Sequence, residues 1–297
     1  MKIVERNYLY TFVIPHKNTP FELSRCIDSI PLRDDIQIIV VDDDSKADKK
    51  PKVNRPDVQI ICLEASTSRG AGQARNVGLR HALGRWVLFA DADDYYLPGF
   101  LDRLDAVASQ AAEIVYFSAD YIRYGKQLEE DNPFKLAIDR FKGSAGSLSD
   151  VRFLCMSNNT VWNRMYSRKF LLDINARFEA IPLGNDVWFS TYVGSKCHSV
   201  EIIEDKLYCY QLTAEGITGT NHPMSHYYRC GRTLIRRNML LLSLGLWPLI
   251  SFSVFHAARI QKDHGKFAYG CYWFFLHFCD PTLIPVMILR FCKSHLR

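Results

Sequence analysis

The sequence lacks the marks of several large protein classes. Its nine cysteines are odd in number and contain no CxxC pair, so we expect reduced, structural thiols of a cytoplasmic protein. The opening residues Met1-Lys-Ile-Val-Glu-Arg have no apolar run typical of a signal peptide, and we therefore expect no export. Internal repeats and low-complexity tracts are also missing. With 48% hydrophobic and 23% charged residues, the composition excludes a disordered chain and fits a globular protein.

Acidic residues are scarce in the last quarter of the chain. From His222 to Arg297 there are ten Lys and Arg residues against two acidic ones, a net charge of +8. The remaining 221 residues carry 27 basic and 30 acidic residues, a net charge of −3. A basic, apolar tail on a near-neutral body favours contact with an anionic surface, and a membrane fits this tail better than nucleic acid.

Long apolar runs are few, and they are broken. Residues 238–258 form a stretch of 21 uncharged residues that includes Gly245 and Pro248. A bilayer span needs about 20 predominantly apolar residues. Two further runs, 267–277 and 283–289, are separated by Asp280-Pro281. With Trp247, Trp273 and flanking basic residues, the tail resembles an interfacial anchor; helices packed on the body, or a spanning segment, are the alternatives.

Strand and helix patterns alternate through the first 120 residues. Aromatic and β-branched runs predict strands, and apolar residues at helical spacing predict the helices between them. The predicted strands are 8–14, ending at Pro15, then 36–41, 58–63, 86–90 and 114–119, with helices over 20–30 and 72–81. This order predicts an open, mostly parallel α/β sheet. Later segments predict helices at 149–156, 167–173 and 186–193 and strands at 199–204 and 207–210.

Three carboxylates follow the strand that begins at Trp86. Asp91, Asp93 and Asp94 lie just beyond its carboxyl end, where open α/β sheets bind ligands. Carboxylates this close repel one another unless a cation lies between them. A divalent metal that holds a phosphate group is the natural cation. The pattern predicts a phosphorylated or nucleotide-linked substrate.

Other polar groups should reach the same edge. Asp42, Asp43 and Asp44 follow the second strand, and they fit either a ligand site or a capped turn. The segment Gly70-Ala-Gly72-Gln-Ala-Arg75-Asn76 lacks the lysine of a phosphate loop. It predicts a helix start whose Arg75 and Asn76 face the site, with Arg75 binding phosphate or pairing with the aspartates.

A late acidic residue stands at the start of a predicted helix. Asn185-Asp186 follows a turn with Pro182 and Gly184. At this position Asp186 is either the N-cap residue of the helix or a general base.

Four of these motifs resemble those of family 2 glycosyltransferases in order and spacing, over about residues 8–105. They are Phe12-Val-Ile-Pro15-His-Lys-Asn18, Val40-Val-Asp42-Asp43-Asp44-Ser45, Gly72-Gln-Ala-Arg75-Asn76-Val-Gly78-Leu and Leu88-Phe-Ala-Asp91-Ala-Asp93-Asp94. A weaker likeness, through Trp162-Asn-Arg-Met-Tyr166 and Asn185-Asp186-Val-Trp-Phe189, extends to about residue 220.

The resemblance implies a GT-A fold, with a Rossmann-like, mostly parallel central sheet flanked by helices. Residues 1–221 would form the catalytic domain, with a nucleotide-sugar half at about 8–105 and an acceptor half at about 106–221. Residues 222–297 would form a helical, basic, apolar appendage that contacts the membrane. The implied activity is an inverting, metal-dependent transfer from a nucleotide-diphosphate sugar, with uridine as the default base, to a glycan or lipid-linked acceptor. The implied place is the cytoplasmic face of a bacterial inner membrane.

The resemblance also assigns roles by position. Pro15 and Asn18 would shape the nucleotide pocket, Asp42 and Asp43 would contact base or ribose, and Arg75 would approach the carboxylates or the diphosphate. Asp91 and Asp93 would form the DxD motif, in which Asp91 would contact the ribose or support the metal site from behind its ligands, and Asp93 would bind Mg²⁺ or Mn²⁺. Asp94 would organise only the turn. Asp186 would be the general base.

The sequence departs from the family's motifs at two positions, and two alternative functions stay open. Asn185 stands where the family often has glutamate, and Asp44 replaces a common glycine or asparagine. A binding protein that kept the fold and lost catalysis is one alternative. A metal-dependent phosphatase with Asp-x-Asp at a strand end is the other, although Tyr95 stands where its motif normally has threonine or valine.

Overall fold

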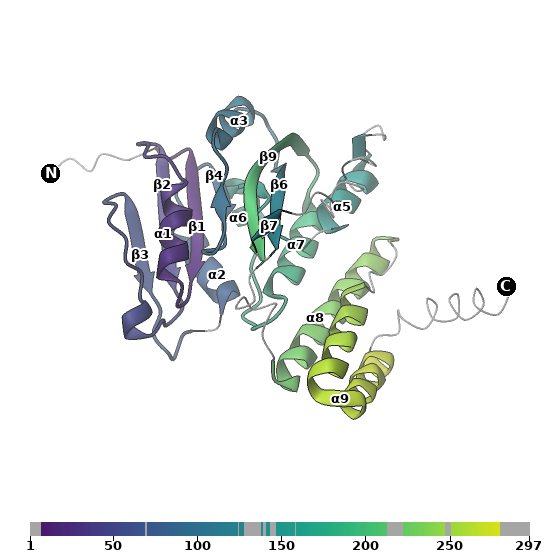
Figure 1. Cartoon of the computed structure of the whole chain (residues 1–297). Coiled ribbons are helices and arrows are strands. Elements are labelled where there is room, and N and C mark those ends of the chain that lie inside the picture. Colours follow the sequence, from purple (N-terminus) through teal and green to yellow (C-terminus); the bar gives the residue numbers. More distant parts are fainter. Residues whose placement is uncertain are drawn as a thin grey trace.

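The computed structural model describes residues 7–68, 70–123, 125–127, 138, 141–142, 147–157, 159–212, 222–246 and 251–279. The apolar run expected at 283–289 and the anchor Trp247 lie outside these residues. Figure 1 shows a central sheet with helices on both faces and a pair of long helices, α8 and α9, beside α7.

The first half of the chain forms the parallel part of the sheet. Its strands lie in the order β3-β2-β1-β4, and every neighbouring pair is parallel. The elements are β1 Tyr10–His16, α1 Pro20–Asp28, β2 Ile36–Asp42, the short 3-10 helix η1 Ala47–Lys49, β3 Val58–Cys62, α2 Ala71–His81 and β4 Trp86–Phe89. The predicted order of strands and helices is confirmed.

The second half extends the same sheet with strands of mixed direction. β8 runs antiparallel to both β4 and β6, whereas β6 and β9 are parallel. The elements are β5 Tyr95–Tyr96, α3 Phe100–Val107, β6 Ile114–Arg123, β7 Lys126–Gln127, α5 Leu148–Ser157, β8 Arg164–Ser167, α6 Arg168–Asp173, α7 Asn185–Lys196 and β9 Val200–Leu212. The α/β class is therefore confirmed, with an antiparallel part added to the parallel one.

Two strand predictions were wrong at their ends. β1 continues through Pro15 to His16 because Pro15 lies beyond Val13, the last residue of β1 that pairs with β4. The missing N–H of proline therefore removes no hydrogen bond from the sheet. The two strands expected at 199–204 and 207–210 are one strand, β9. Its pairing with β6 shifts register after Phe117, and this bulge explains the polar break in the pattern.

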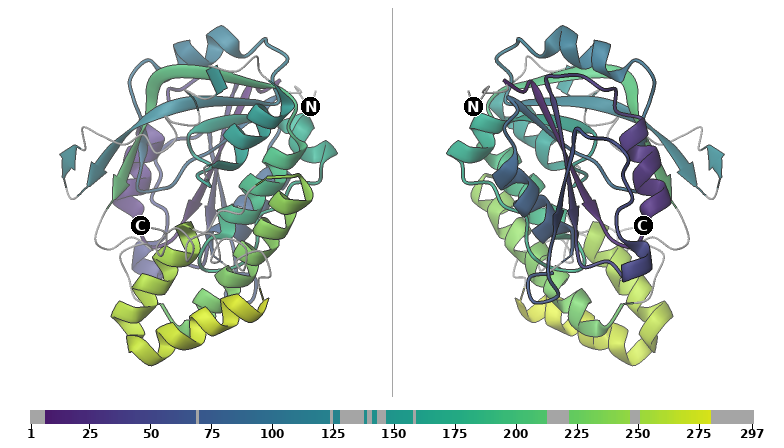
Figure 2. Two further views of the ribbon diagram at one scale, coloured as in Figure 1. Left: turned by 90° about the vertical axis from the view of Figure 1, so that its right-hand side faces the viewer. Right: turned by 90° about the vertical axis from the view of Figure 1, so that its left-hand side faces the viewer.

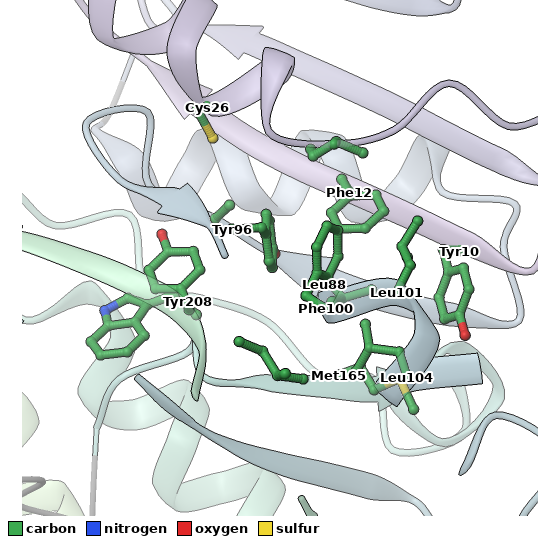
Figure 3. Close-up of a cluster of buried hydrophobic side chains, with 14 of the residues drawn as sticks. Tyr10, Phe12, Cys26, Leu88, Tyr96, Phe100, Leu101, Leu104, Met165 and Tyr208 are labelled. Atoms are coloured by element: carbon green, nitrogen blue, oxygen red, sulfur yellow. The ribbon is translucent and has the colours of Figure 1, made fainter. Parts of the chain in front are cut away.

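Each face of the sheet buries its own apolar cluster. Phe12 and Ile14 of β1 pack with side chains from α1 and α3, including Leu23, Cys26 and Leu104, and Figure 3 shows this cluster around Phe12 and Leu88. On the other face, residues of α2, α5, α6 and α7 pack against β1, β4, β6 and β8. The alternation of side chains along β1 thus places helices on both faces.

The C-terminal helices are α8 Met224–Ser243 and α9 Ser251–Cys279, and α9 is interrupted at Gly265, where φ is +84°. Val187 of α7 packs with Cys230 and Leu234 of α8, and Tyr227 of α8 packs with α9. Figure 2 shows the two helices folded beside the body. Within the described ranges, no helix is long and apolar enough to cross a membrane.

Close packing of α2 on β1 gives a test of the fold. A Cβ at Gly78 would lie 2.3 Å from Cγ1 of Val13, whereas a Cβ at Gly270 in α9 would meet nothing within 4 Å. We expect Gly78→Ala to lower the free energy of unfolding by about 1–3 kcal/mol through overpacking. Gly270→Ala, the control, should leave it unchanged or raise it by up to about 1 kcal/mol. Denaturant titration of both variants measures the difference, and equal stabilities would contradict this packing.

Candidate active site

The carboxyl ends of the parallel strands form one polar edge. His16 at the end of β1 lies opposite Asp42 at the end of β2. Asp91 follows β4, which is the other neighbour of β1. The predicted acidic groups from two strand ends therefore meet at the same edge of the sheet, as the fold requires.

Asp42 is occupied by contacts within the protein. Its side chain is 1% exposed, and Oδ1 lies 2.8 Å from Nδ1 of His16. The Ser45 hydroxyl donates to the same oxygen, and the Ser45 N–H donates to Oδ2 over 3.3 Å. The Thr19 N–H donates to Nε2 of His16, so Nδ1 carries the proton and donates to Asp42. Asp42 thus holds the loops together, and its contact with a nucleotide stays a prediction.

Asp43 and Asn18 shape the neighbouring turns. Asp43 accepts from the Gly70 N–H over 3.1 Å and lies 3.4 Å from Nζ of the half-exposed Lys17. Asn18 has a φ of +61°, a conformation that asparagine tolerates better than most residues. Its N–H donates to the Ser45 hydroxyl, and its Oδ1 accepts from the Lys46 N–H. Pro15 is buried within β1. These contacts tie the β1 and β2 loops into one rim.

Asp94 is a structural carboxylate. It is fully buried and accepts from the Tyr208 hydroxyl over 2.8 Å and from the Gln211 N–H over 2.7 Å. The Tyr208 hydroxyl also accepts from the Asp91 N–H over 3.0 Å. Burial, followed by the charges of Asp91 and Asp93, raises the pKa of Asp94 well above its usual range. Asp94 and Tyr208 therefore fasten the turn after β4 to β9.

Asp91 and Asp93 remain partly exposed at the edge. Burial raises the pKa of the Asp93 carboxyl to about 6, and the Asp91 charge is the second cause. Arg25 donates to the Asp93 carbonyl and lies over the Tyr95 ring. Two carboxylates with an unfavourable mutual charge form a place where a cation is stabilised.

Arg75 joins the two halves of the site. Its Nη2 donates to Asp91 over 2.5 Å, and its Nη1 donates to Oδ1 of Asn185 over 2.8 Å. The guanidinium also lies 5.4 Å from the centre of the Phe178 ring. Of the two predictions for Arg75, pairing with the aspartates is confirmed by this geometry. Binding of a diphosphate stays a prediction.

Asn76 does not face the site as expected. Its amide donates to the Phe178 carbonyl over 2.9 Å and accepts from the Phe178 N–H over 2.8 Å. One side chain can make both bonds because an asparagine amide holds a donor and an acceptor side by side. Asn76 therefore fixes the segment that leads to α7 and is not a ligand-facing group.

Asp186 lies in the first turn of α7, beside this bridge. The N-cap residue is Gly184, with φ +67° and no side-chain cap, so the N-cap interpretation of Asp186 was wrong. Burial raises the pKa of Asp186 to about 6; the Arg75 charge opposes this and the Asp91 charge adds to it. A carboxylate with such a pKa is deprotonated at neutral pH and close enough to titration to accept a proton.

A divalent metal fits the chemistry of Asp93. Among the residues that the structure describes, no group of three or more His, Cys, Asp and Glu side chains could hold a metal by itself. Hard cations such as Mg²⁺ commonly bind through one or two carboxylates together with substrate phosphates. Asp93 is a partly exposed carboxylate of this kind, and its binding of Mg²⁺ or Mn²⁺ stays a prediction.

Sequence reasoning missed several residues that build this site. Tyr208 lies 114 residues from Asp94, and no local pattern marks it. His16 and Ser45 stand inside motifs that were recognised, but their contact with Asp42 depends on the register between β1 and β2. Polar residues at the strand ends, next to the acidic cluster, were the sequence feature that could have indicated His16 and Ser45.

The sequence is similar to one family model and to several known proteins. The family model described as "Glycosyl transferase family 2" matches residues 11–174. The succinoglycan biosynthesis protein ExoO of Rhizobium meliloti is 31% identical over 183 residues, covering 59% of this chain and 53% of ExoO. The Escherichia coli enzyme WfaP, named as a UDP-Glc:alpha-D-GlcNAc-diphosphoundecaprenol beta-1,3-glucosyltransferase, is 41% identical over 63 residues, 21% of this chain and 25% of WfaP.

Solved structures show the same fold. S. aureus TarS 1-349 in complex with UDP-GlcNAc has a TM-score of 0.61 at 19% identity, and the match covers 78% of this chain and 66% of that one. This chain spans about half the length of ExoO.

The Tyr208 contact gives a test of how the turn after β4 is held. Tyr208→Phe leaves the Asp91 N–H without its acceptor and removes one donor from buried Asp94. We expect a loss of about 1–3 kcal/mol in the free energy of unfolding. Tyr192→Phe is the control, because that hydroxyl donates to one partly buried carbonyl, Ile174. A loss no larger than the control's, measured by denaturant titration, would show that Tyr208 does not anchor the turn.

Proposed function

The chain belongs to glycosyl transferase family 2, and we propose that it transfers a sugar from a nucleotide-diphosphate sugar to a hydroxyl of a glycan or lipid-linked acceptor. The observation that carries the proposal is the Arg75 bridge. It joins Asp91, at the end of β4, to Asn185, directly before Asp186. The bridge supports the proposal because it connects the strand end proposed to bind the donor with the start of α7, the helix of the proposed base.

The donor is proposed to be linked to uridine diphosphate. The name of WfaP includes UDP-Glc, and TarS was solved with UDP-GlcNAc. The rim built by Pro15, Asn18 and Asp43 lies at the carboxyl edge of the sheet, where α/β folds place nucleotides. In this proposal, Asp42 and Asp43 form the base and ribose end of the rim; Asp42 is held by His16 and Ser45, and Asp43 accepts from the Gly70 N–H.

In the proposed mechanism Asp186 is the general base. Its carboxylate takes the proton from the acceptor hydroxyl, whose oxygen attacks the anomeric carbon from the face opposite the diphosphate, so that the configuration inverts. Arg75 orients Asp91 toward the donor and keeps positive charge near Asp186. Mg²⁺ or Mn²⁺ held by Asp93 and the donor phosphates would neutralise the charge of the departing diphosphate.

Two other functions can be weighed against transfer. The family match and the two linked halves of the site favour transfer over phosphatase action. A protein that binds nucleotide-sugars without turnover would have the same donor rim. The kinetic test of Asp186 distinguishes such a protein from a transferase.

Replacement of Asp186 tests the base. We expect Asp186→Asn to lower the release of nucleoside diphosphate from a UDP-sugar by about 10²–10⁴-fold, with donor binding preserved. The wild-type rate should rise as pH increases through about 6, because the base must be deprotonated and its pKa is raised to about 6.

The same variant should be more stable than the wild type at neutral pH. The folded protein binds the Asp186 proton more tightly than the unfolded chain, whose carboxyl has a pKa of 3.8. Stability from this group is therefore present below 3.8 and lost as pH rises through about 6. A higher melting temperature for Asp186→Asn shows that lost activity is not lost folding. Near-wild-type turnover would remove Asp186 from the role.

The metal proposal is tested through donor binding. We expect Mn²⁺ or Mg²⁺ to increase the thermal stabilisation by a UDP-sugar, since ligand at about 100 times its dissociation constant adds about 2.7 kcal/mol. Asp93→Ala should abolish the metal-dependent part. Asp34→Ala is the control, because Asp34 is an exposed aspartate just before β2, at the opposite edge of the sheet. Donor binding that ignores metal in the wild type would refute the proposal.

Peripheral contact with a membrane is proposed for the C-terminal helices, which would place the enzyme at the cytoplasmic face of the inner membrane. Phe267 and Phe274 on α9 are 86% and 64% exposed, and Lys262 and Lys266 are exposed on the same helix. Exposed aromatic rings beside lysines suit a surface of anionic lipid.

Vesicles of anionic phospholipid test this contact. We expect Phe267→Ser with Phe274→Ser to reduce co-sedimentation several-fold, because each ring would bury apolar area in the interface. Phe21→Ser is the matched control, since Phe21 is 83% exposed on α1. Equal sedimentation of both variants and wild type would contradict the role of α9.

A further inference from the structure

The segment between α6 and α7, which contains Phe178 and Glu179, is held from two sides. On one side is α2, where Asn76 makes two hydrogen bonds to the main chain of Phe178. A Cβ at Gly72 would lie 2.2 Å from the Glu179 carbonyl oxygen, so the segment lies against the helix backbone. The side chain of Phe178 stacks on Phe189 of α7 at 3.8 Å between ring centres.

On the other side is α8, which engages both carboxylate oxygens of Glu179. The Thr233 hydroxyl donates to Oε2, and Nη1 of Arg236 donates to Oε1 over 3.1 Å. The Arg236 guanidinium also lies 3.5 Å from the centre of the Trp188 ring of α7. Glu179 is therefore bound by two residues of α8, one of which also contacts the helix that carries Asp186.

The main chain of Glu179 completes the connection. Its N–H donates to the carbonyl of Asn185 over 3.3 Å, and Asn185 is the first residue of α7. Close packing adds to this, because a Cβ at Gly184 would lie 2.7 Å from Sγ of Cys230 on α8. One residue thus links α8, through its side chain, to the first turn of α7, through its backbone.

Charge alone does not explain this arrangement. Arg236 is 57% exposed, and an exposed ion pair contributes little to stability. The Thr233 bond and the aromatic contact restrict the geometry of Glu179, and a restricted geometry is what positions a reactive group.

We propose that Glu179 is a positioning residue for the general base, and that Thr233 and Arg236 make α8 part of the catalytic unit. This rests on the proposed role of Asp186. In this arrangement α8 holds the Glu179 carboxylate, the Glu179 backbone holds Asn185, and Asp186 is kept at a fixed distance from the donor edge that Arg75 defines.

The test uses the full chain with Glu179→Ala and Arg236→Ala. The control is Arg232→Ala, an exposed arginine one turn away on α8. With UDP-GlcNAc or UDP-glucose as the donor, we expect kcat for release of UDP to fall about ten- to a hundredfold in both variants, with KM for the donor changed by less than about twofold. Arg232→Ala should keep both constants. Glu179→Gln, whose amide oxygen can still accept from Thr233 or Arg236, should keep more of kcat than Glu179→Ala.

Hydrogen exchange of the donor-free protein gives an independent result. Amides at the start of α7 should exchange faster in Glu179→Ala and Arg236→Ala than in wild type, while amides of α1 and α2 stay unchanged. Unaltered exchange at α7, or unaltered kcat in an active enzyme, would overturn the proposal. A wild-type protein that neither binds nor cleaves UDP-sugars would instead refute the proposed function, and the exchange experiment would still decide whether α8 holds the first turn of α7.

Discussion

The pairing of Arg75 with Asp91 is the interaction on which the site depends. Parallel strands end at one edge, so a fold of this kind concentrates carboxylates there, and their repulsion must be offset. Arg75 donates to Asp91 with one nitrogen and to Asn185 with the other. Because Asn185 is neutral, its hydrogen bond with Arg75 is not a second ion pair. The guanidinium charge therefore acts on Asp91 and on the nearby Asp186. A glutamate at this position, common in the family, would instead form a second ion pair with Arg75.

The three aspartates after β4 differ because their surroundings differ. Asp94 is fully buried and bonded to β9, whereas Asp91 and Asp93 are partly exposed. A buried carboxylate with two donors organises the backbone. Of the two that are partly exposed, Asp91 accepts from Arg75, and Asp93 is the residue proposed to bind the metal. At β2 no such division exists, because Asp42 and Asp43 are both buried and both accept hydrogen bonds from loop residues.

The parallel half of the fold could be predicted because its signals are local. Apolar runs, turns and helix starts follow one another between residues 8 and 90, and the strand ends then bring Asp42, Asp43 and Asp91 to one edge. The bulge in β9, the direction of Asn76 and the Tyr208–Asp94 bond could not be predicted in this way. Each depends on segments far apart in the chain that meet through tertiary packing. The sequence motif singled out Asp186, but it did not show where the helix begins. Gly184, with a positive φ, is the N-cap residue of α7, so Asp186 lies in the first turn.

The C-terminal helices contact the proposed site as well as forming an appendage. Charge and hydropathy alone predict that they form an appendage, and their basic residues favour contact with a membrane. Thr233 and Arg236 nevertheless contact Glu179, and Cys230 packs against Gly184, so α8 is joined to the segment that carries Asp186. A helix pair that meets a lipid surface through α9 and holds the base through α8 would keep the base at a fixed height above that surface. For the lipid-linked acceptor proposed above, whose sugar would stand near the headgroups, a fixed height would keep the acceptor hydroxyl within reach of the proposed base.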